Sequence, residues 1–275
     1  MHDIVLYALA GGSVGFVIGM TGVGGGSFMT PILLAFCFKP AIAVGTDLLY
    51  AAVTKGSGVI THHRQQTVEW TIVARMTAGS IPASLLTTYL LKHLQHHGFD
   101  YNAMLTITLG VMLILTSLVL LFRTILLHER HQLADDESRI GKFERRHAPQ
   151  LTVVMGIALG ILVTLSSVGA GAFGAAVLMI LYPRMAMIRI IGTDLAHAVP
   201  LTAVAGLGHL HLGHVNFMLL GGLLLGSLPG IWLGTRLAYR IPEKVMQRTM
   251  ALILLALGLK YAFFSSVSIG LQTCT

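Results

Sequence analysis

Residues 45–48 read Gly-Thr-Asp-Leu, and the same four residues return at 192–195, which is 147 positions later (192 minus 45). The same step, without a gap, relates two further pairs of segments, 79–82 (GSIP) with 226–229 (GSLP) and 22–24 (GVG) with 169–171 (GAG). A shared register of this length is hard to obtain by chance, so the chain is predicted to contain two homologous halves. In an apolar chain, two halves with glycine-interrupted segments at matching positions indicate a secondary transporter.

The composition is that of a membrane protein. Hydrophobic residues make up 55% of the chain and charged residues 11%, with a mean hydropathy of +0.78. Runs such as 103–122 and 217–233 are long enough, or nearly so, to cross a bilayer, which takes about 20 apolar residues. Little chain is left for a soluble catalytic domain. The two cysteines, Cys37 and Cys274, are far apart and lack a C-x-x-C pattern, which argues against a zinc site or thiol chemistry.

Ten apolar segments are predicted, five in each half. They are 4–20, 26–38, 41–61, 70–91 and 101–122, followed by 151–167, 172–182, 187–208, 215–238 and 245–266. The second segment of each half is too short for a full crossing and is typical of a re-entrant or half-spanning helix. The predicted fold is an all-α polytopic membrane protein, with transmembrane repeat 1 at 1–122, a charged linker at 123–150 and transmembrane repeat 2 at 151–275.

The basic residues set the predicted orientation. The linker and its flanks, the stretches 184–189 and 236–248, and Arg64 together hold 13 of the 18 Lys and Arg residues. Cytoplasmic loops are enriched in Lys and Arg, so these regions are placed in the cytoplasm. That arrangement requires the first two segments of each half to return to the side they left. It makes the second half an inverted copy of the first and puts both termini outside a bacterial inner membrane.

Two glycine-rich stretches, 19–27 and 166–174, carry the predicted binding site. Glycine breaks helices, and broken helix inside a membrane is tolerated only where protein or water satisfies the backbone. In an inverted repeat the two tips would meet near the midplane, with the N-termini of the short helices pointing inward, and such N-termini attract anions. The alternative is that these glycines only permit close helix packing. The predicted substrate-binding residues are Thr21, Gly24, Gly25, Gly26, Ser27, Ser166, Ser167, Gly169 and Gly171, together with Thr46, Thr193 and Lys55.

Ionisable residues inside the predicted spans give the candidates for proton coupling, which are Asp47, Asp194 and His197. Intramembrane charges are costly and usually functional. The alternative for the Thr-Asp pairs is that they cap the neighbouring broken helix. Lys55 could pair with Asp47, hold the charge of the anion, or extend to the cytoplasmic surface. His197 could titrate near neutral pH or serve as a hydrogen-bonded helix contact.

The G-x-x-G-x-G-G-G pattern at 19–26 and the G-T-[SD]-L pattern in each half resemble the TauE/SafE family of sulfite and organosulfonate exporters. The resemblance covers nearly the whole chain outside the charged linker. Ala172 and Phe173 stand where that family usually has glycine, and Asp47 and Asp194 where it often has serine. The resemblance implies a plasma-membrane carrier that moves small sulfur-containing anions with the proton gradient as driving force.

Two other functions stay open at this point. One is uptake of thiosulfate or another anion. The other is a metal-binding membrane enzyme or assembly factor that would use His209, His211 and His214 as ligands. The favoured prediction is a secondary transporter, not an enzyme, that works by alternating access. Its expected partners are a small anion and the lipid bilayer, without nucleic acid, metal or other cofactor, and a homo-oligomer is left open.

Overall fold

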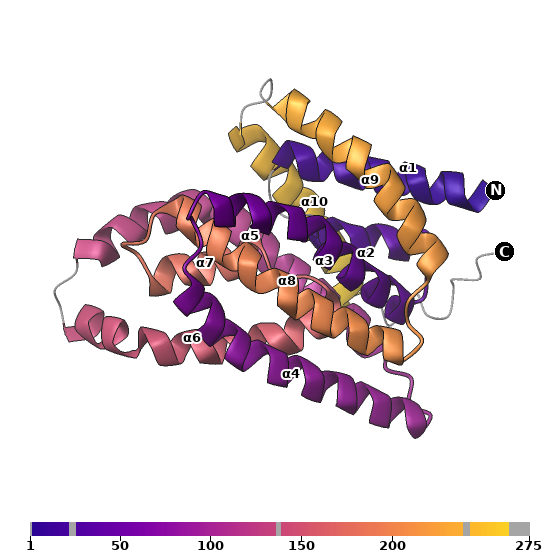
Figure 1. The fold of residues 1–275 in the computed structure, drawn as a ribbon, viewed down its shortest axis with the longest axis horizontal. Helices are drawn as coiled ribbons and strands as arrows, with labels where there is room; N and C mark the ends of the chain where they lie inside the picture. The colour runs from indigo at the N-terminus through magenta and orange to yellow at the C-terminus, as the bar shows by residue number, and fades with distance from the viewer. Residues whose placement is uncertain (1, 22–25, 136–138, 239–242, 264–275) are drawn as a thin grey trace.

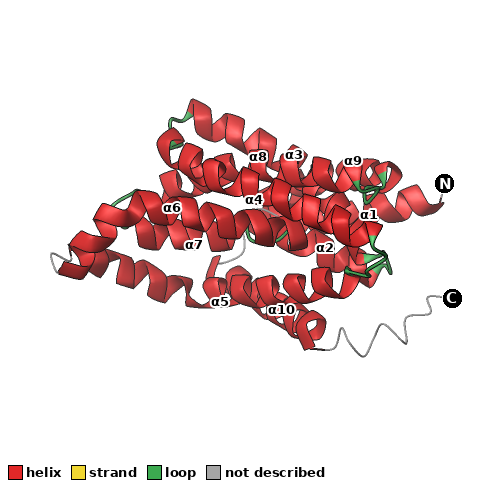
Figure 2. Cartoon of the chain, turned by 90° about the horizontal axis from the view of Figure 1, so that it is seen from below, coloured by secondary structure: helices red, strands yellow, loops and turns green. Residues whose placement is uncertain are grey.

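The computed structural model describes residues 2–21, 26–135, 139–238 and 243–263, and within them the chain forms ten helices and no strand (Figures 1 and 2). The helices are α1 His2–Thr21, α2 Gly26–Ala35, α3 Pro40–Arg64, α4 Trp70–His96, α5 Asn102–Asp135, α6 Arg139–Ser166, α7 Ala172–Leu181, α8 Met187–His211, α9 Phe217–Ala238 and α10 Glu243–Phe263. They lie on the ten predicted segments. Four stretches among the described residues are long and apolar enough to cross a membrane, namely Asn102–Phe122, His147–Ser166, Met187–His211 and Phe217–Gly234.

The charged linker is more helical than its sequence pattern indicates. Helix α5 runs for 34 residues and α6 for 28, so both continue from the apolar core into the 123–150 stretch. Glu, Arg, Gln and Leu, which are frequent there, are good helix formers and extend a helix even without an apolar face. The C-terminal end of α5 and the N-terminal end of α6 project from the end of the bundle opposite the start of α1 (Figure 1).

Loop contacts define two ends of the bundle. At the Tyr101 end, Tyr101 contacts His214, and Gly45 near the start of α3 packs on the backbone of His214. At the Glu69 end, Arg189 near the start of α8 forms an ion pair with Glu69 at 2.7 Å. Helices α3 and α8 occupy equivalent positions in the two halves of the sequence, yet they run in opposite directions through the bundle.

Helices of one half pair with helices of the other half. Helix α1 packs along α9, and its counterpart α6 packs along α4, while α3 contacts α8 and α5 contacts α10. Glycines allow the close approach, because each faces the partner's backbone in four equivalent contacts: Gly156–Met76, Gly160–Ser80, Gly11–Leu223 and Gly15–Ser227. The partners in α4 and α9 differ by 147 positions, but the glycines in α6 and α1 differ by 145 (156 minus 11). The 147-residue repeat therefore relates α4 to α9. The packing glycines of α1 and α6 are instead related by 145 residues, which is two fewer.

Candidate functional site

The chain breaks between α6 and α7 in the interior of the bundle. The backbone at Ser167, Gly169 and Gly171 has φ values of 60°, 119° and 150°, in the left-handed region that favours glycine. Ser167 is the one of these three with a side chain, and strain of this kind concentrates at functional sites. The Ser166 hydroxyl donates to the carbonyl oxygen of Leu162 (2.6 Å) and so satisfies backbone next to the break.

The N-terminus of α7 presents free N–H groups at this break. The carbonyl oxygens of Gly169 and Gly171 accept the N–H groups of Gly174 (3.1 Å) and Ala175 (2.9 Å). The N–H groups of the two preceding residues, 172 and 173, have no acceptor in the part of the chain that the structure describes. A helix N-terminus with free N–H groups carries about half a positive charge. The second glycine stretch thus has the chemistry expected of an anion-binding tip.

The two aspartates of the repeated Gly-Thr-Asp-Leu motif pack against the short helices α2 and α7. The Asp194 carboxylate lies so close to Gly174, in the first turn of α7, that a Cβ there would collide with it. In the first half, the Thr30 hydroxyl of α2 donates to Asp47 Oδ2 at 2.5 Å. The Ser167 hydroxyl lies near Asp47 but outside hydrogen-bonding geometry. Both carboxylates are buried, and each keeps one oxygen without a hydrogen-bond donor. The protein's own anions therefore occupy positions beside both half-helices.

Lys55 joins the two halves at the break. Its Nζ donates to the carbonyl oxygen of Ala170 at 2.7 Å, so a side chain of α3 reaches the α6–α7 connection. Lys55 is 6% exposed and is attracted electrostatically by Asp194 and Asp47. It does not extend to the membrane surface, which was one of its predicted alternatives. With both carboxylates ionised, the cluster carries one negative charge more than Lys55 can balance.

His197 completes this buried cluster. Its Nε2 shares a 2.8 Å hydrogen bond with Ser80 Oγ, and its Nδ1 has no partner. Lys55 acts on it electrostatically, so the two side chains are close. In the other half, Tyr50 occupies the position equivalent to His197 and lies near Ser227, the counterpart of Ser80. The serine of the repeated Gly-Ser-x-Pro motif therefore faces the third helix of the opposite half in both cases.

The threonines of the repeated motif connect the halves. The Asn216 N–H donates to Thr46 Oγ1 (3.2 Å), and the Glu69 N–H donates to Thr193 Oγ1 (3.0 Å). Asn216 and Glu69 immediately precede or cap α9 and α4, and they too are 147 positions apart. Each hydroxyl therefore fixes the start of a helix in the other half. That these threonines also bind substrate stays a prediction.

We expect Thr193→Val and Thr46→Val each to lower the free energy of unfolding by about 1 kcal/mol, the usual cost of losing a helix-capping hydroxyl. The two contacts lie at opposite ends of the bundle, so the double variant should lose the sum of the two effects. Thermal melting of purified protein in detergent at a fixed scan rate measures both. Thr61→Val, at an exposed position of α3, is the control; equal melting of the Thr193 and Thr61 variants would contradict the assignment.

The first glycine stretch is described only in part. Gly26 begins α2, whereas Gly24 and Gly25 lie outside the described residues, and nothing of the side chains of Thr21 and Ser27 is described. The convergence of the two tips therefore stays a prediction, and the structure describes the second tip and the aspartates beside both short helices.

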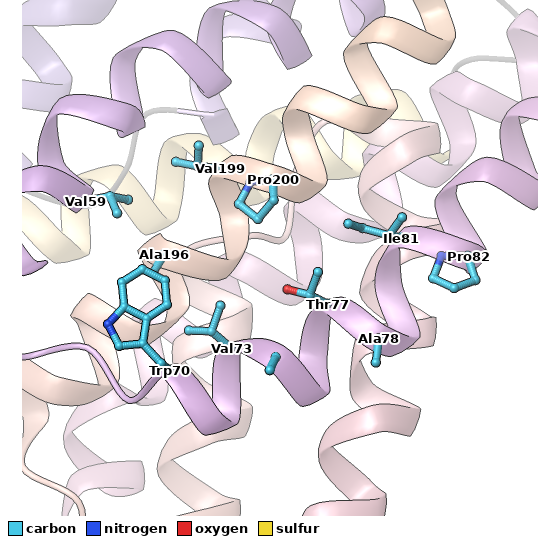
Figure 3. Close-up of a pocket in the computed structure, with 11 residues that line it drawn as sticks. Val59, Trp70, Val73, Thr77, Ala78, Ile81, Pro82, Ala196, Val199 and Pro200 are labelled. Carbon is cyan, nitrogen blue, oxygen red and sulfur yellow. The ribbon is translucent and has the colours of Figure 1, made fainter.

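An open groove of about 790 Å³ lies between α3, α4 and α8 (Figure 3). Its walls are almost entirely apolar. Thr77 contributes a hydroxyl group to the lining, and Trp70 lies at one edge of the groove (Figure 3). None of the buried charged residues lines it. Its chemistry suits an acyl chain rather than an anion, so this groove is not the site built around Lys55.

The histidines proposed as metal ligands do not converge. His209 and His214 are buried and in contact, whereas His211 is exposed. Among the described residues, no three or more His, Cys, Asp or Glu side chains come close enough to hold a metal ion.

Residues 7–261 match the family described as sulfite exporter TauE/SafE. The chain belongs to the TauE/SafE family. It is also similar to three Bacillus subtilis (strain 168) proteins named as probable membrane transporters. They are YjnA, 36% identical over 92% of this chain and 97% of the relative, YdhB, 28% identical over 91% and 96%, and YunE, 23% identical over 91% and 92%. No solved structure matches this TauE/SafE chain significantly. Family and relatives agree that it is a membrane transporter.

Three members of the candidate site were missed by the sequence prediction, namely Thr30, Ser80 and the carbonyl of Ala170. Ser80 lies in a repeated motif, and that repetition was a usable signal. Thr30 has no hydroxyl counterpart in α7, and a backbone carbonyl leaves no trace in a sequence.

Proposed function

We propose that this protein exports small sulfur-containing anions, such as sulfite or sulfonates, across the bacterial inner membrane by proton-coupled alternating access. The observation that carries the proposal is the hydrogen bond from Lys55 to Ala170 at the α6–α7 break, beside two buried carboxylates. It supplies a cation, a helix N-terminus and two proton acceptors at one buried place in a TauE/SafE chain.

The charge balance explains how protons and anions are linked. Asp194 lies at the first turn of α7, where an incoming anion would also be attracted. Two adjacent negative charges are unfavourable in a buried site, and an uncompensated carboxylate there takes up a proton. Protonation of Asp194 weakens its hold on α7 and leaves Lys55 and the free N–H groups of residues 172 and 173 to the anion. Loss of the proton returns the carboxylate and expels the anion, so the proton and the anion cross in the same direction and the outward gradient of the anion drives export.

The arrangement of the halves supports an inverted repeat. Helices α3 and α8 run in opposite directions, and the contacts of Thr46 and Thr193 are equivalent but lie at opposite ends. Opening one end separates the halves at one threonine while the other contact holds, which is the behaviour that alternating access requires. Arg64, Arg184 and Arg189 gather at the Glu69 end, so the positive-inside rule assigns that end, and the α5–α6 connection, to the cytoplasm.

Flux measurements in proteoliposomes test the proposal. Sulfite, taurine, thiosulfate and sulfate are compared as the internal solute, with a pH gradient imposed in either direction. We expect efflux of sulfite or taurine to be driven by a pH gradient that is acidic inside the vesicles, because the proton and the anion leave together. A preference for thiosulfate entering the vesicles would favour the uptake alternative, and gradient-insensitive flux would overturn proton coupling.

The matching variant is Asp194→Asn. An amide cannot release a proton, so we expect gradient-driven flux to fall by about tenfold or more, a typical size for a coupling free energy. Anion binding, measured as protection against thermal unfolding, should persist and lose its pH dependence. The control is Lys92→Gln at an exposed position of α4, which removes a charge outside the cluster and should leave both measurements unchanged. Gradient-driven flux in Asp194→Asn equal to that of the wild type would rule out its coupling role.

A further inference from the structure

A second set of titratable groups lies away from Lys55, at the Tyr101 end. Tyr101 OH and His214 Nε2 are 2.8 Å apart, His214 Nδ1 and His209 Nδ1 are 3.3 Å apart, and His209 Nε2 lies 2.9 Å from the carbonyl oxygen of Thr164. All three side chains are buried, with His209 fully so. They form one continuous hydrogen-bonded chain that starts beside the exposed 97–100 loop and ends inside the bundle.

The acceptor at the inner end fixes every proton in this chain. A carbonyl oxygen can only accept, so His209 carries its proton on Nε2 and its Nδ1 is a lone pair. His214 must then donate from Nδ1, which leaves its Nε2 as an acceptor for the Tyr101 hydroxyl. All ring nitrogens are satisfied with both histidines neutral. Burial lowers the pKa of His214 and raises the pKa of Tyr101, and both shifts favour this neutral starting state.

One extra proton fits without any heavy atom moving. A proton that arrives at the Tyr101 oxygen lets the hydroxyl pass its own proton to His214 Nε2. His214 passes its Nδ1 proton to His209 Nδ1, and the two hydrogen bonds reverse direction. His209 is then an imidazolium that still donates to Thr164, His214 is neutral with its proton on Nε2, and Tyr101 again holds one proton. The chain has gained one proton, and no bond between heavy atoms has changed.

The C-terminus of α6 lies at the inner end and partly compensates the burial of that charge. Thr164 lies in the last turn of α6, two residues before the helix ends at Ser166, where carbonyl groups lack intrahelical donors. The C-terminus of a helix carries a partial negative charge and stabilises a nearby cation. The dipole therefore offsets part of the cost of holding a proton on buried His209.

Few other groups that titrate or carry charge face the chain. Asp100 acts on Tyr101 from the α4–α5 loop, and His209 and His214 act on each other. Helix α3 contributes Gly45, which packs on both histidines, and α6 contributes Thr164, both uncharged. In the described parts of the chain, none of the three residues forms an ion pair.

The other half lacks this device. His62 is the counterpart of His209, and its Nδ1 meets Thr67 Oγ1 at 2.8 Å. The Thr67 hydroxyl donates to the carbonyl oxygen of His62 (3.0 Å), so these hydrogen bonds begin and end at His62 and reach no further residue. Threonine at the position of His214 makes a fixed contact, and the two ends of the protein therefore differ.

We propose that Tyr101, His214 and His209 form a proton wire that takes one proton from the Tyr101 end and holds it on His209 at the C-terminus of α6. The wire would deliver protons to the neighbourhood of the helix break from one side of the membrane only. It depends on the hydrogen-bond geometry and not on the identity of the transported anion.

Histidine tautomers report the wire directly. The full chain is labelled with ¹⁵N-histidine, purified in detergent, and its ring-nitrogen resonances are assigned with His209→Asn and His214→Asn. At alkaline pH we expect the proton of His214 on Nδ1 and that of His209 on Nε2. As the pH falls, both rings should change in one step, with His214 moving its proton to Nε2 and His209 becoming doubly protonated. A His214 proton on Nε2 at alkaline pH, or two independent titrations, would overturn the proposal.

His209→Gln keeps the test independent of folding failure. The glutamine amide can donate to the Thr164 carbonyl, and its oxygen can accept from His214 Nδ1, but it takes up no proton. We expect wild-type melting, a His214 proton fixed on Nδ1 at all pH values, and one proton fewer bound per molecule in acid titration. His211→Asn, at an exposed neighbouring position, should titrate as the wild type. A tautomer change of His214 that persists in His209→Gln would sink the wire, whether or not sulfite transport is found.

Discussion

Lys55→Met is expected to destabilise the protein by about 3–5 kcal/mol, the usual cost of removing one partner from a buried group of charges. The substitution leaves Asp194 and Asp47 without their cation and the Ala170 carbonyl without its donor. Anion binding should be lost as well, because Lys55 is the one cation in the described cluster. Thermal melting in detergent should show a decrease in Tm of about 10 °C, given a few degrees per kcal/mol for a chain of this size.

A second substitution separates charge from packing. Lys55→Met combined with Asp194→Asn removes an ammonium and a carboxylate together, so we expect the double variant to recover part of the lost stability. Directly interacting residues typically show a coupling energy of about 0.5–3 kcal/mol in such a cycle. Lys92→Met, at an exposed position of α4, is the control for removal of a positive charge. If the double variant were as unstable as the sum of its single variants, the electrostatic account of Lys55 would be wrong.

Gly226→Leu is expected to prevent α9 from packing on α1. A Cβ at Gly226 would overlap the carbonyl oxygen of Ala8 and come within 2.8 Å of the Gly12 nitrogen. Backbone atoms cannot rotate away, so the two helices must separate, and we expect a loss of about 3 kcal/mol or more. Folded, monodisperse protein should fall sharply in size-exclusion chromatography after detergent extraction.

The same helix provides the control for this substitution. Gly221 is exposed, and a Cβ there meets nothing within 4 Å. Gly221→Leu should leave the yield of folded protein unchanged or raise it slightly, because leucine favours the helix more than glycine does. Equal losses in the two variants would mean that glycine in α9 serves helix insertion in general rather than the contact with α1.

The break between α6 and α7 and the positions of the ten helices could be predicted from the amino-acid sequence alone. The glycines at 169 and 171 adopt backbone angles that favour glycine, and a broken helix inside an apolar chain needs a polar purpose. Asp47 and Asp194 could also be identified as candidates, since a charged residue at the same place in two apolar segments is costly and indicates a functional role. These are local properties, because they depend on residue type and on spacing along one segment.

The contacts across the halves could not be read in the same way. Whether Lys55 reached Asp47, the anion or the surface depended on the path of a flexible side chain, and the fold brings it to Ala170, 115 positions away (170 minus 55). The threonines of the repeated motif were predicted as ligands, and the sequence did not reveal that their hydroxyls accept hydrogen bonds from Asn216 and Glu69 of the opposite halves. His209 and His214 were considered as metal ligands, and the structure buries them in a hydrogen-bonded chain with Tyr101.

The duplication, the helix breaks and the buried charges can thus be predicted from the sequence, because each follows from local chemistry repeated at a fixed interval. Which distant side chains contact one another is decided only in the folded protein. The packing of α3 against α8, and of each outer pair, sets which distant side chains meet, and helix packing depends on surface shape that no single segment contains. The two-residue shift of α1 relative to α6 has the same origin, since glycines align on the backbone they touch rather than on their place in the repeat.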